Sequence, residues 1–377
     1  MSTLHSFMKR VTGFLRHDPV LAAALILAVL SAFFVPPSAA YLGYIDFHVL
    51  ALLFSLMLVV AGLQRSGAFD LLTERLLARV SSKRALAAVL VGVCFFTSML
   101  ITNDVALITF VPLSILLLGE EADDKLLMLV IVLQTIAANL GSSLTPLGNP
   151  QNLYLYSLSG MRLSEFLSVM LPPTILSAIL LSAAVAMIRP DKISQPSSGD
   201  RKVTVSVKKM LPWIALFLLC MLAVLHLIHY LVMLLIVTAA VTLLDRSLLR
   251  KADYGLLLTF IGFFIFIGNM KSIPAISGVL SSLVTGRELI TGVVLSQIIS
   301  NVPAAMLLSG FTTDYPNLLL GVNLGGLGTL IASMASMISY KQYASASRAN
   351  PGKYLALFTL LNVVFLIILL PIIYLII

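Results

Sequence analysis

The chain contains 377 residues, of which 59% are hydrophobic and 11% are charged. A soluble domain carries roughly 25% charged residues, so this composition, with a mean hydropathy of +1.05, excludes a soluble protein and indicates a polytopic membrane protein. The 24 basic and 16 acidic residues give a net charge of +8. We interpret this excess as basic cytoplasmic loops, with no nucleic-acid partner.

The first part of the chain predicts two spans and a hairpin. Apolar runs at 19–36 and 48–64 predict membrane spans, and residues 65–84 predict an amphipathic helix along the cytoplasmic interface. Residues 84–119 are too many for one span, which needs about 20 residues. We interpret them as a re-entrant hairpin that enters and leaves on the same side, with two tight full spans as the alternative.

An interrupted span follows an acidic loop. Residues 126–161 are apolar except between Gly141 and Pro150, where glycines loosen the backbone and prolines remove hydrogen-bond donors. This pattern predicts a broken helix. The next span is 164–188, which completes an N-terminal half at 1–188.

The basic stretch 189–209 predicts a cytoplasmic linker between the two halves, and the C-terminal half covers 210–377. Its predicted elements are spans 210–227, 230–244 and 254–270, a small and mixed stretch 272–285, a hairpin 286–311, a broken span 317–340 and a last span 354–377.

A two-part polar unit occurs twice. The tip of the first hairpin carries Asn103 and is followed 36 residues later by Asn139, where a polar break begins. The second tip carries Asn301 and is followed 22 residues later by Asn323. Helix-breaking backbone at membrane depth is tolerated where it is buried or lines a cavity. Two such units in matching positions predict the binding site of a transporter built from two repeats.

The distribution of basic residues predicts the orientation. With two hairpins and nine full spans, the N-terminus lies in the cytoplasm and the C-terminus outside. Three of the 24 basic residues, Arg162, Lys271 and Arg287, then fall outside, and the others fall inside, as the positive-inside rule requires. Residues 84–161 and 286–340 become inverted repeats on this map.

The candidate substrate-binding residues come from the tips and the breaks. Asparagine offers a donor and an acceptor, and the N-termini of half-helices favour anions. The alternative for Asn139 and Asn323 is local capping of the broken helices. The candidates are Thr102, Asn103, Asn139, Gly141, Ser142, Ser143, Thr145, Asn149, Ser300, Asn301, Asn323, Gly325, Gly326 and Thr329.

Asp104 is the one ionisable residue that this map places at membrane depth. A charge there costs several kcal/mol unless it is paired or hydrated, so we predict that Asp104 couples transport to a sodium ion or a proton, together with Asn103 and Asn301. The alternative is a structural role as the N-cap of the returning arm. No cofactor and no metal other than sodium at the hairpin tips is expected.

Two motifs resemble a known family. Thr102-Asn103-Asp104 followed by Pro112, and the run from Leu147 to Asn152, are similar to the ion transporter superfamily, in particular to its arsenite-permease-like anion permeases with a citrate-transporter-like domain. The resemblance covers roughly residues 48–377. It implies two inverted repeats, a transport part that moves past a scaffold, and a homodimer. In the sodium-coupled carboxylate branch each tip reads Ser-Asn-Thr, which neither tip of this chain matches.

We therefore predict a secondary active transporter in the cell membrane that moves a small anion, an inorganic oxyanion or a carboxylate, by alternating access. The alternative is a sodium/proton antiporter. A membrane-embedded enzyme would need a motif such as HExxH or a Ser/Lys dyad at depth, which the sequence lacks, so we expect no enzymatic activity.

Overall fold

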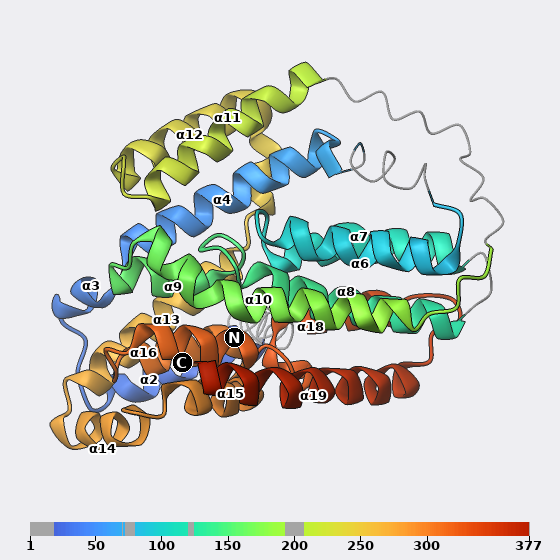
Figure 1. Ribbon diagram of the computed structural model, residues 1–377. Coiled ribbons are helices and arrows are strands. Elements are labelled where there is room, and N and C mark those ends of the chain that lie inside the picture. Colours follow the sequence, from blue (N-terminus) through green and yellow to red (C-terminus); the bar gives the residue numbers. More distant parts are fainter. Residues whose placement is uncertain (1–18, 70, 72–79, 120–123, 193–206, 377) are drawn as a thin grey trace, which may run out of the picture.

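The computed structural model describes residues 19–69, 71, 80–119, 124–192 and 207–376, and nearly all regular structure in these ranges is helical (Figure 1). The helices of the first half are α2 (Pro19–Ala32), α3 (Ala40–Tyr44), α4 (Phe47–Arg65), α6 (Lys83–Ser98), α7 (Asn103–Gly119), α8 (Asp124–Ser142), α9 (Pro150–Ser159) and α10 (Leu163–Ala186). Those of the second half are α11 (Val207–Val224), α12 (Tyr230–Asp245), η1 (Arg246–Lys251), α13 (Tyr254–Lys271), α14 (Pro274–Val284), α15 (Glu288–Ile299), α16 (Asn301–Ser309), α17 (Tyr315–Leu324), η2 (Leu330–Ala332), α18 (Met334–Ala344) and α19 (Pro351–Ile376).

The helices have the length and composition of membrane spans. Six of the described helices are long and apolar enough to cross a bilayer, or seven if the bent pair α14–α15 counts as one span. The prediction of an all-α polytopic membrane protein is confirmed, and each expected span coincides with a helix or a helix pair. The first helix is shorter than expected because it ends at Ala32. Pro36 and Pro37 follow, and a proline disfavours helical backbone in the residue before it.

Some expectations concern residues outside the described ranges. Residues 70 and 72–79 of the amphipathic helix expected at 65–84, residues 120–123 of the acidic loop and residues 193–206 of the linker at 189–209 lie there. The end of that linker is helical, since α11 begins at Val207. Lysines at a helix end keep their charged groups in water while their stems lie along apolar surface. The small stretch at 272–285 also forms a helix, α14, which begins with Pro274 in its first turn.

Both predicted hairpins are helix pairs. In the first, α6 and α7 pack together and are joined by residues 99–102. In the second, α15 and α16 are separated by Ser300 alone. Thr102 and Ser300 both have positive φ angles, of 72° and 79°. Such backbone is uncommon outside glycine, and strained residues of this kind recur at functional sites.

Both predicted breaks are present, with shifted boundaries. The first lies between α8 and α9 at 143–149, and the second lies between α17 and α18 at 325–333 with η2 inside it. Asn139, Gly141 and Asn323 therefore lie in the last helical turns and not in the breaks. Gly141 does not break the helix. A glycine is needed there because α8 packs closely on α6, and a Cβ would collide with the Phe95 carbonyl.

The two hairpins open toward opposite ends of α10. At the C-terminal end of α10, the Arg84 guanidinium donates to the Ile188 carbonyl over 2.7 Å, beside the start of α6. Near the other end, Leu158 at the end of α9 lines one cavity with Gly310, which follows α16. A helix of 24 residues is about 36 Å long. In Figure 1 the open end of α6 and α7 lies at the right, and α14 and α16 lie at the left.

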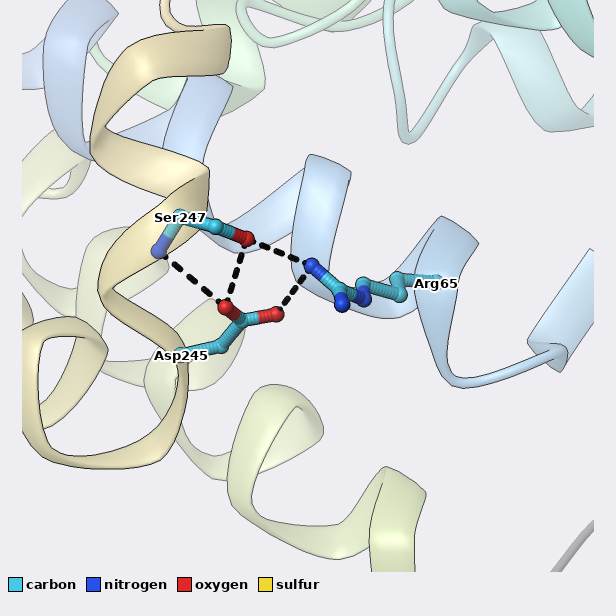
Figure 2. Close-up of polar contacts among 3 residues, drawn as sticks. All are labelled: Arg65, Asp245 and Ser247. Atoms are coloured by element: carbon cyan, nitrogen blue, oxygen red, sulfur yellow. Dashed lines mark hydrogen bonds and ion pairs between the residues drawn. The ribbon is translucent and has the colours of Figure 1, made fainter.

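The helices α4, α11 and α12 pack together beside the region of hairpins and breaks (Figure 1). An ion pair joins the end of α4 to the end of α12, since Arg65 lies 2.5 Å from Asp245. Figure 2 shows that Ser247 completes the cluster by hydrogen bonds to both side chains. The Arg65 side chain is 54% exposed, so the pair contributes at most about 1 kcal/mol and mainly orients this corner.

Candidate functional site

Four helix N-termini converge on one small cavity at the centre of the molecule. The lining residues are Asn103 and Asp104 of α7, Pro150 and Gln151 of α9, Asn301 and Val302 of α16, Ser333 and Met334 at the start of α18, and Leu256 of α13. The space open to the centre of a water molecule is about 10 Å³, enough for about one water. Each helix N-terminus carries about half a positive charge and unpaired N–H groups, so the cavity favours a negatively charged group.

Asn139 connects the first hairpin to the second break. Its side-chain oxygen accepts hydrogen bonds from Asn103 at 3.1 Å and from Ser333 at 3.0 Å. Its amide nitrogen donates to the Gly326 carbonyl at 3.4 Å and to Ser336 at 3.3 Å. These partners belong to both halves of the chain, so local capping, the alternative for Asn139, is not its role.

Asn323, at the second break, makes the corresponding contacts with residues of the first break. Its side-chain oxygen accepts from Asn149 over 3.0 Å, and its amide nitrogen donates to Asn152 over 2.7 Å and to the Leu319 carbonyl of its own helix. Asn149 also accepts from the Asn152 N–H over 2.8 Å and so caps α9. The main partners of Asn323, like those of Asn139, lie in the opposite half.

The two sets of contacts are reciprocal. Asn149 follows Asn139 by ten residues, and Ser333 follows Asn323 by ten. In each half, the residue that precedes the second half-helix donates to the asparagine that ends the first half-helix of the other half. A two-fold relation between two surfaces produces this pattern, in which residue i contacts j and the equivalent of i contacts the equivalent of j.

Close backbone packing is also repeated. A Cβ on Gly141 would lie 2.8 Å from the Ser98 hydroxyl of α6, and one on Gly325 would lie 2.6 Å from the Ser296 hydroxyl of α15. Both distances are shorter than a Cβ atom keeps from a non-bonded neighbour. Glycine therefore permits each hairpin arm to lie against the end of its broken helix, as small residues do between membrane helices.

Asp104 has an unpaired oxygen. Its Oδ1 is buried and has no hydrogen-bond partner among the described residues. At the start of α7, the Asn103 side-chain oxygen accepts from the Asp104 N–H over 3.0 Å. Asp104 is the second residue of α7, whereas an N-cap precedes the helix, so the alternative interpretation of Asp104 as an N-cap is not supported. Asn301 lines the same cavity as Asp104.

The other predicted site residues surround this centre. The Thr145 hydroxyl donates to the Met99 carbonyl at the first tip, and the Ser143 hydroxyl donates to Leu140 over 2.6 Å. The Ser142 hydroxyl accepts from Asn149 at 3.2 Å. The Thr145 contact holds the first break against the first hairpin, and the other two bonds lie within the break and the end of α8.

Three predicted residues lie at the edge of the site. The Thr102 backbone forms the turn at the first tip and its side chain is half-buried. The Ser300 hydroxyl donates to the Ala332 carbonyl at 3.4 Å. Thr329 is exposed, and its N–H donates to Gln297 over 2.9 Å. The structure does not bring Thr329 to the cavity.

Sequence reasoning missed Asn152, Ser333 and Ser336. Asn152 donates to the Ser142, Ser143 and Thr145 carbonyls, and so holds the first break together. Gln297 does the same in the second break, where it donates to Gly325 and Leu327 over 2.9 Å each. The equal spacing from Asn139 and Asn323 is the signal that could have identified Ser333.

The comparisons with known proteins agree with this arrangement. The family model described as citrate transporter matches residues 10–314. The chain is 34% identical to the inner membrane protein YbiR of Escherichia coli over 87% of this chain and 88% of that protein. It is 32% identical to the uncharacterized transporter MJ0456 of Methanocaldococcus jannaschii, over 86% and 88%.

A third relative matches a shorter region. The chain is 37% identical to the silicon efflux transporter LSI3 of rice, Oryza sativa, over 40% of this chain and 31% of that protein. The family and two of these three relatives are named as transporters and none as an enzyme, which agrees with the expectation that the chain is not an enzyme. The chain belongs to the citrate transporter family and is a multi-pass membrane transporter.

Proposed function

We propose that this protein is a secondary active transporter that moves a small anion by alternating access, driven by a sodium or proton gradient. The observation that carries the proposal is the convergence of four helix N-termini on one small cavity, whose lining includes Asp104 with its unpaired oxygen. The helix ends would bind the anion, and Asp104 would bind the coupling cation or proton.

The reciprocal contacts support alternating access. Two halves related by a two-fold axis in the membrane plane can exchange their arrangements and thereby open the same site to either side. The contacts of Asn149 with Asn323 and of Ser333 with Asn139 fit such inverted repeats. Hairpins that open toward opposite ends of α10 fit them as well. We expect a cytoplasmic N-terminus, an outer C-terminus, and a homodimer that crosslinking in membranes would detect.

The central cavity must widen before it binds any of the candidate anions. Its volume fits about one water-sized group, which is smaller than an inorganic oxyanion and much smaller than citrate. The rice relative is named for silicon and the family for citrate, so silicate and citrate belong in the test together with arsenite, phosphate and sulfate.

The test begins with ligand binding. A ligand that binds the folded state raises its melting temperature, so the purified protein is heated with each of these solutes and with sodium and lithium. Asn301→Ala should abolish the shift. Asn317→Ala, which removes an amide bonded to Asp314 outside the cavity, should retain it. Uptake of the stabilising solute into proteoliposomes under an imposed gradient then tests transport, and uptake without any gradient dependence would contradict coupling.

A sodium/proton antiporter is the second candidate. The unpaired Asp104 oxygen favours it, because a buried carboxylate in a cavity without a lysine or arginine in its described lining can bind a cation. Sodium-dependent proton movement in proteoliposomes without any anion substrate would favour this function over anion transport.

A further inference from the structure

A second and much larger cavity lies at the end of the molecule where α3 meets α13. Its volume is about 600 Å³, compared with a central cavity that accommodates one water. The exposed residues Phe47 and Lys271 belong to its lining, and so do Asp46 and His48 of the α4 N-terminus. The Lys271 ammonium group has no ion-pair partner among the described residues, so it is free to attract an anion.

Three helices line both cavities. On α9, Gln151 lines the central cavity and Tyr154 and Leu158 line the large one. Residues three or four positions apart lie on one face of a helix, so a single stripe of α9 runs from one cavity to the other. The distance along the axis from Gln151 to Tyr154 is only about 5 Å.

The other two helices repeat this arrangement. On α13, Leu256 lines the central cavity and Phe264 the large one, eight residues further on. On α16, Val302 lines the central cavity and Gly310 follows the helix at the large one. The α16 helix contacts both α9 and α13, so the residues that line the two cavities follow one line along neighbouring helices.

An aromatic cluster lies along this line. The Tyr154 ring lies 6.1 Å from Phe260 and 5.9 Å from Phe264, and the two phenylalanines lie 6.0 Å apart, measured between ring centroids. All three side chains are buried. Phe260 lies between Leu256 and Phe264 on α13, and Tyr154 follows Gln151 by about one turn on α9, so the cluster lies next to the stretches of helix that separate the residues lining the two cavities.

One hydrogen bond holds the tyrosine in place. The Tyr154 hydroxyl lies 2.8 Å from the Ser309 hydroxyl of α16. Ser309 donates its own proton to the Met306 carbonyl over 2.9 Å, so Tyr154 is the donor, because a serine hydroxyl has one proton. The bond connects the helix after the first break to the returning arm of the second hairpin.

We propose that the large cavity is the entry vestibule of the transport pathway, and that Tyr154, with Phe260 and Phe264, is the gate between this vestibule and the central site. The vestibule admits a small hydrated anion, and the gate opens when the Tyr154–Ser309 hydrogen bond breaks. The inference rests on the proposed transport function, which assigns the central cavity as the substrate site.

The test measures access directly and needs no substrate. Two reporters are made separately: Leu158→Cys in the vestibule, where the leucine is 39% exposed, and Val302→Cys in the central cavity. A membrane-impermeant thiol reagent is added to intact cells and to inside-out vesicles. The native Cys94 and Cys220 are buried, so the unmodified protein gives the baseline.

Leu158→Cys should react quickly from one membrane face, and Val302→Cys should react slowly from that face. Adding Tyr154→Phe to Val302→Cys removes only the hydroxyl and should speed its labelling from that face about five- to tenfold, as expected when one ordinary hydrogen bond is lost from the closed state. Tyr154→Ala should speed it further. The Leu158→Cys rate should not change in either background.

Tyr354 provides a matched control, because it is buried, stacks on Phe358 and has its hydroxyl 3.3 Å from Ser339. Tyr354→Phe should leave Val302→Cys labelling unchanged, and melting temperatures verify that each variant is folded. An unchanged Val302→Cys rate in both Tyr154 variants, or acceleration only from the face opposite to the Leu158→Cys face, would overturn the gate. Uptake activity alongside such a result would still support the transport function.

Discussion

Replacing Asp104 by asparagine removes the negative charge from the central cavity while it keeps the shape of the side chain. The stability change should be small because two effects oppose each other. The loss of the carboxylate at the N-terminus of α7 costs about 0.3–2 kcal/mol of favourable interaction with the helix dipole. The amide carries no charge, so it lowers the cost of burying an oxygen that has no partner, a cost that is about 1–3 kcal/mol for a neutral group and larger for a charged one.

Transport should respond much more strongly than folding. If Asp104 binds the coupling ion, Asp104→Asn abolishes the dependence of uptake on the imposed gradient, while the melting temperature of the protein changes little. Uptake into proteoliposomes with and without a sodium or proton gradient measures this directly. The equivalent position in the second hairpin is Val302, so no second carboxylate in that tip can replace Asp104.

Asp314→Asn is the matched control. Asp314 is a structural N-cap that accepts from the Asn317 N–H over 3.1 Å, and asparagine caps a helix nearly as well as aspartate. This variant should transport normally. If Asp104→Asn also shows normal gradient-driven uptake and only Asp104→Ala loses it, then Asp104 is a structural residue and the coupling site must lie elsewhere.

Further outcomes follow from the packing. Gly141→Ala should lower the free energy of unfolding by about 1–3 kcal/mol, because its Cβ would collide with the Phe95 carbonyl; an unchanged denaturation midpoint would show that α6 and α8 can separate. Asn149→Ser should keep the cap of α9 but lose the bond to Asn323, so it should reduce transport with a smaller loss of stability than Asn149→Ala; equal melting temperatures of the two variants would argue against a capping contribution. A reporter that is active only in the cytoplasm should be silent after Ile377, and strong activity would contradict the nine-span orientation.

The sequence was informative wherever one residue acts on its own backbone. Prolines and glycines between Gly141 and Pro150, and polar residues within apolar runs, predicted both broken helices and both hairpins, because these residues disrupt a helix locally. The composition excluded a soluble protein, and the motif from Leu147 to Asn152 pointed to the transporter family that the comparisons identified.

The partners of the buried amides depended on the tertiary structure. Asn139 bonds to Ser336, 197 residues away, and Asn323 bonds to Asn152, 171 residues away. The local sequence around an asparagine is the same whether its side chain caps its own helix or bonds to the other half of the chain. A buried amide must find a partner, and the packing of the two halves determines which partner lies within reach.

The same reason explains Asp104 and Tyr154. The sequence singled out Asp104 as a charge in an apolar region, but its unpaired oxygen depends on how four helix ends meet around it. Tyr154 carried no signal in the sequence, because an aromatic residue in an apolar helix is ordinary. Its position between two cavities follows from the packing of α9 against α16, which brings its hydroxyl to Ser309, 155 residues away.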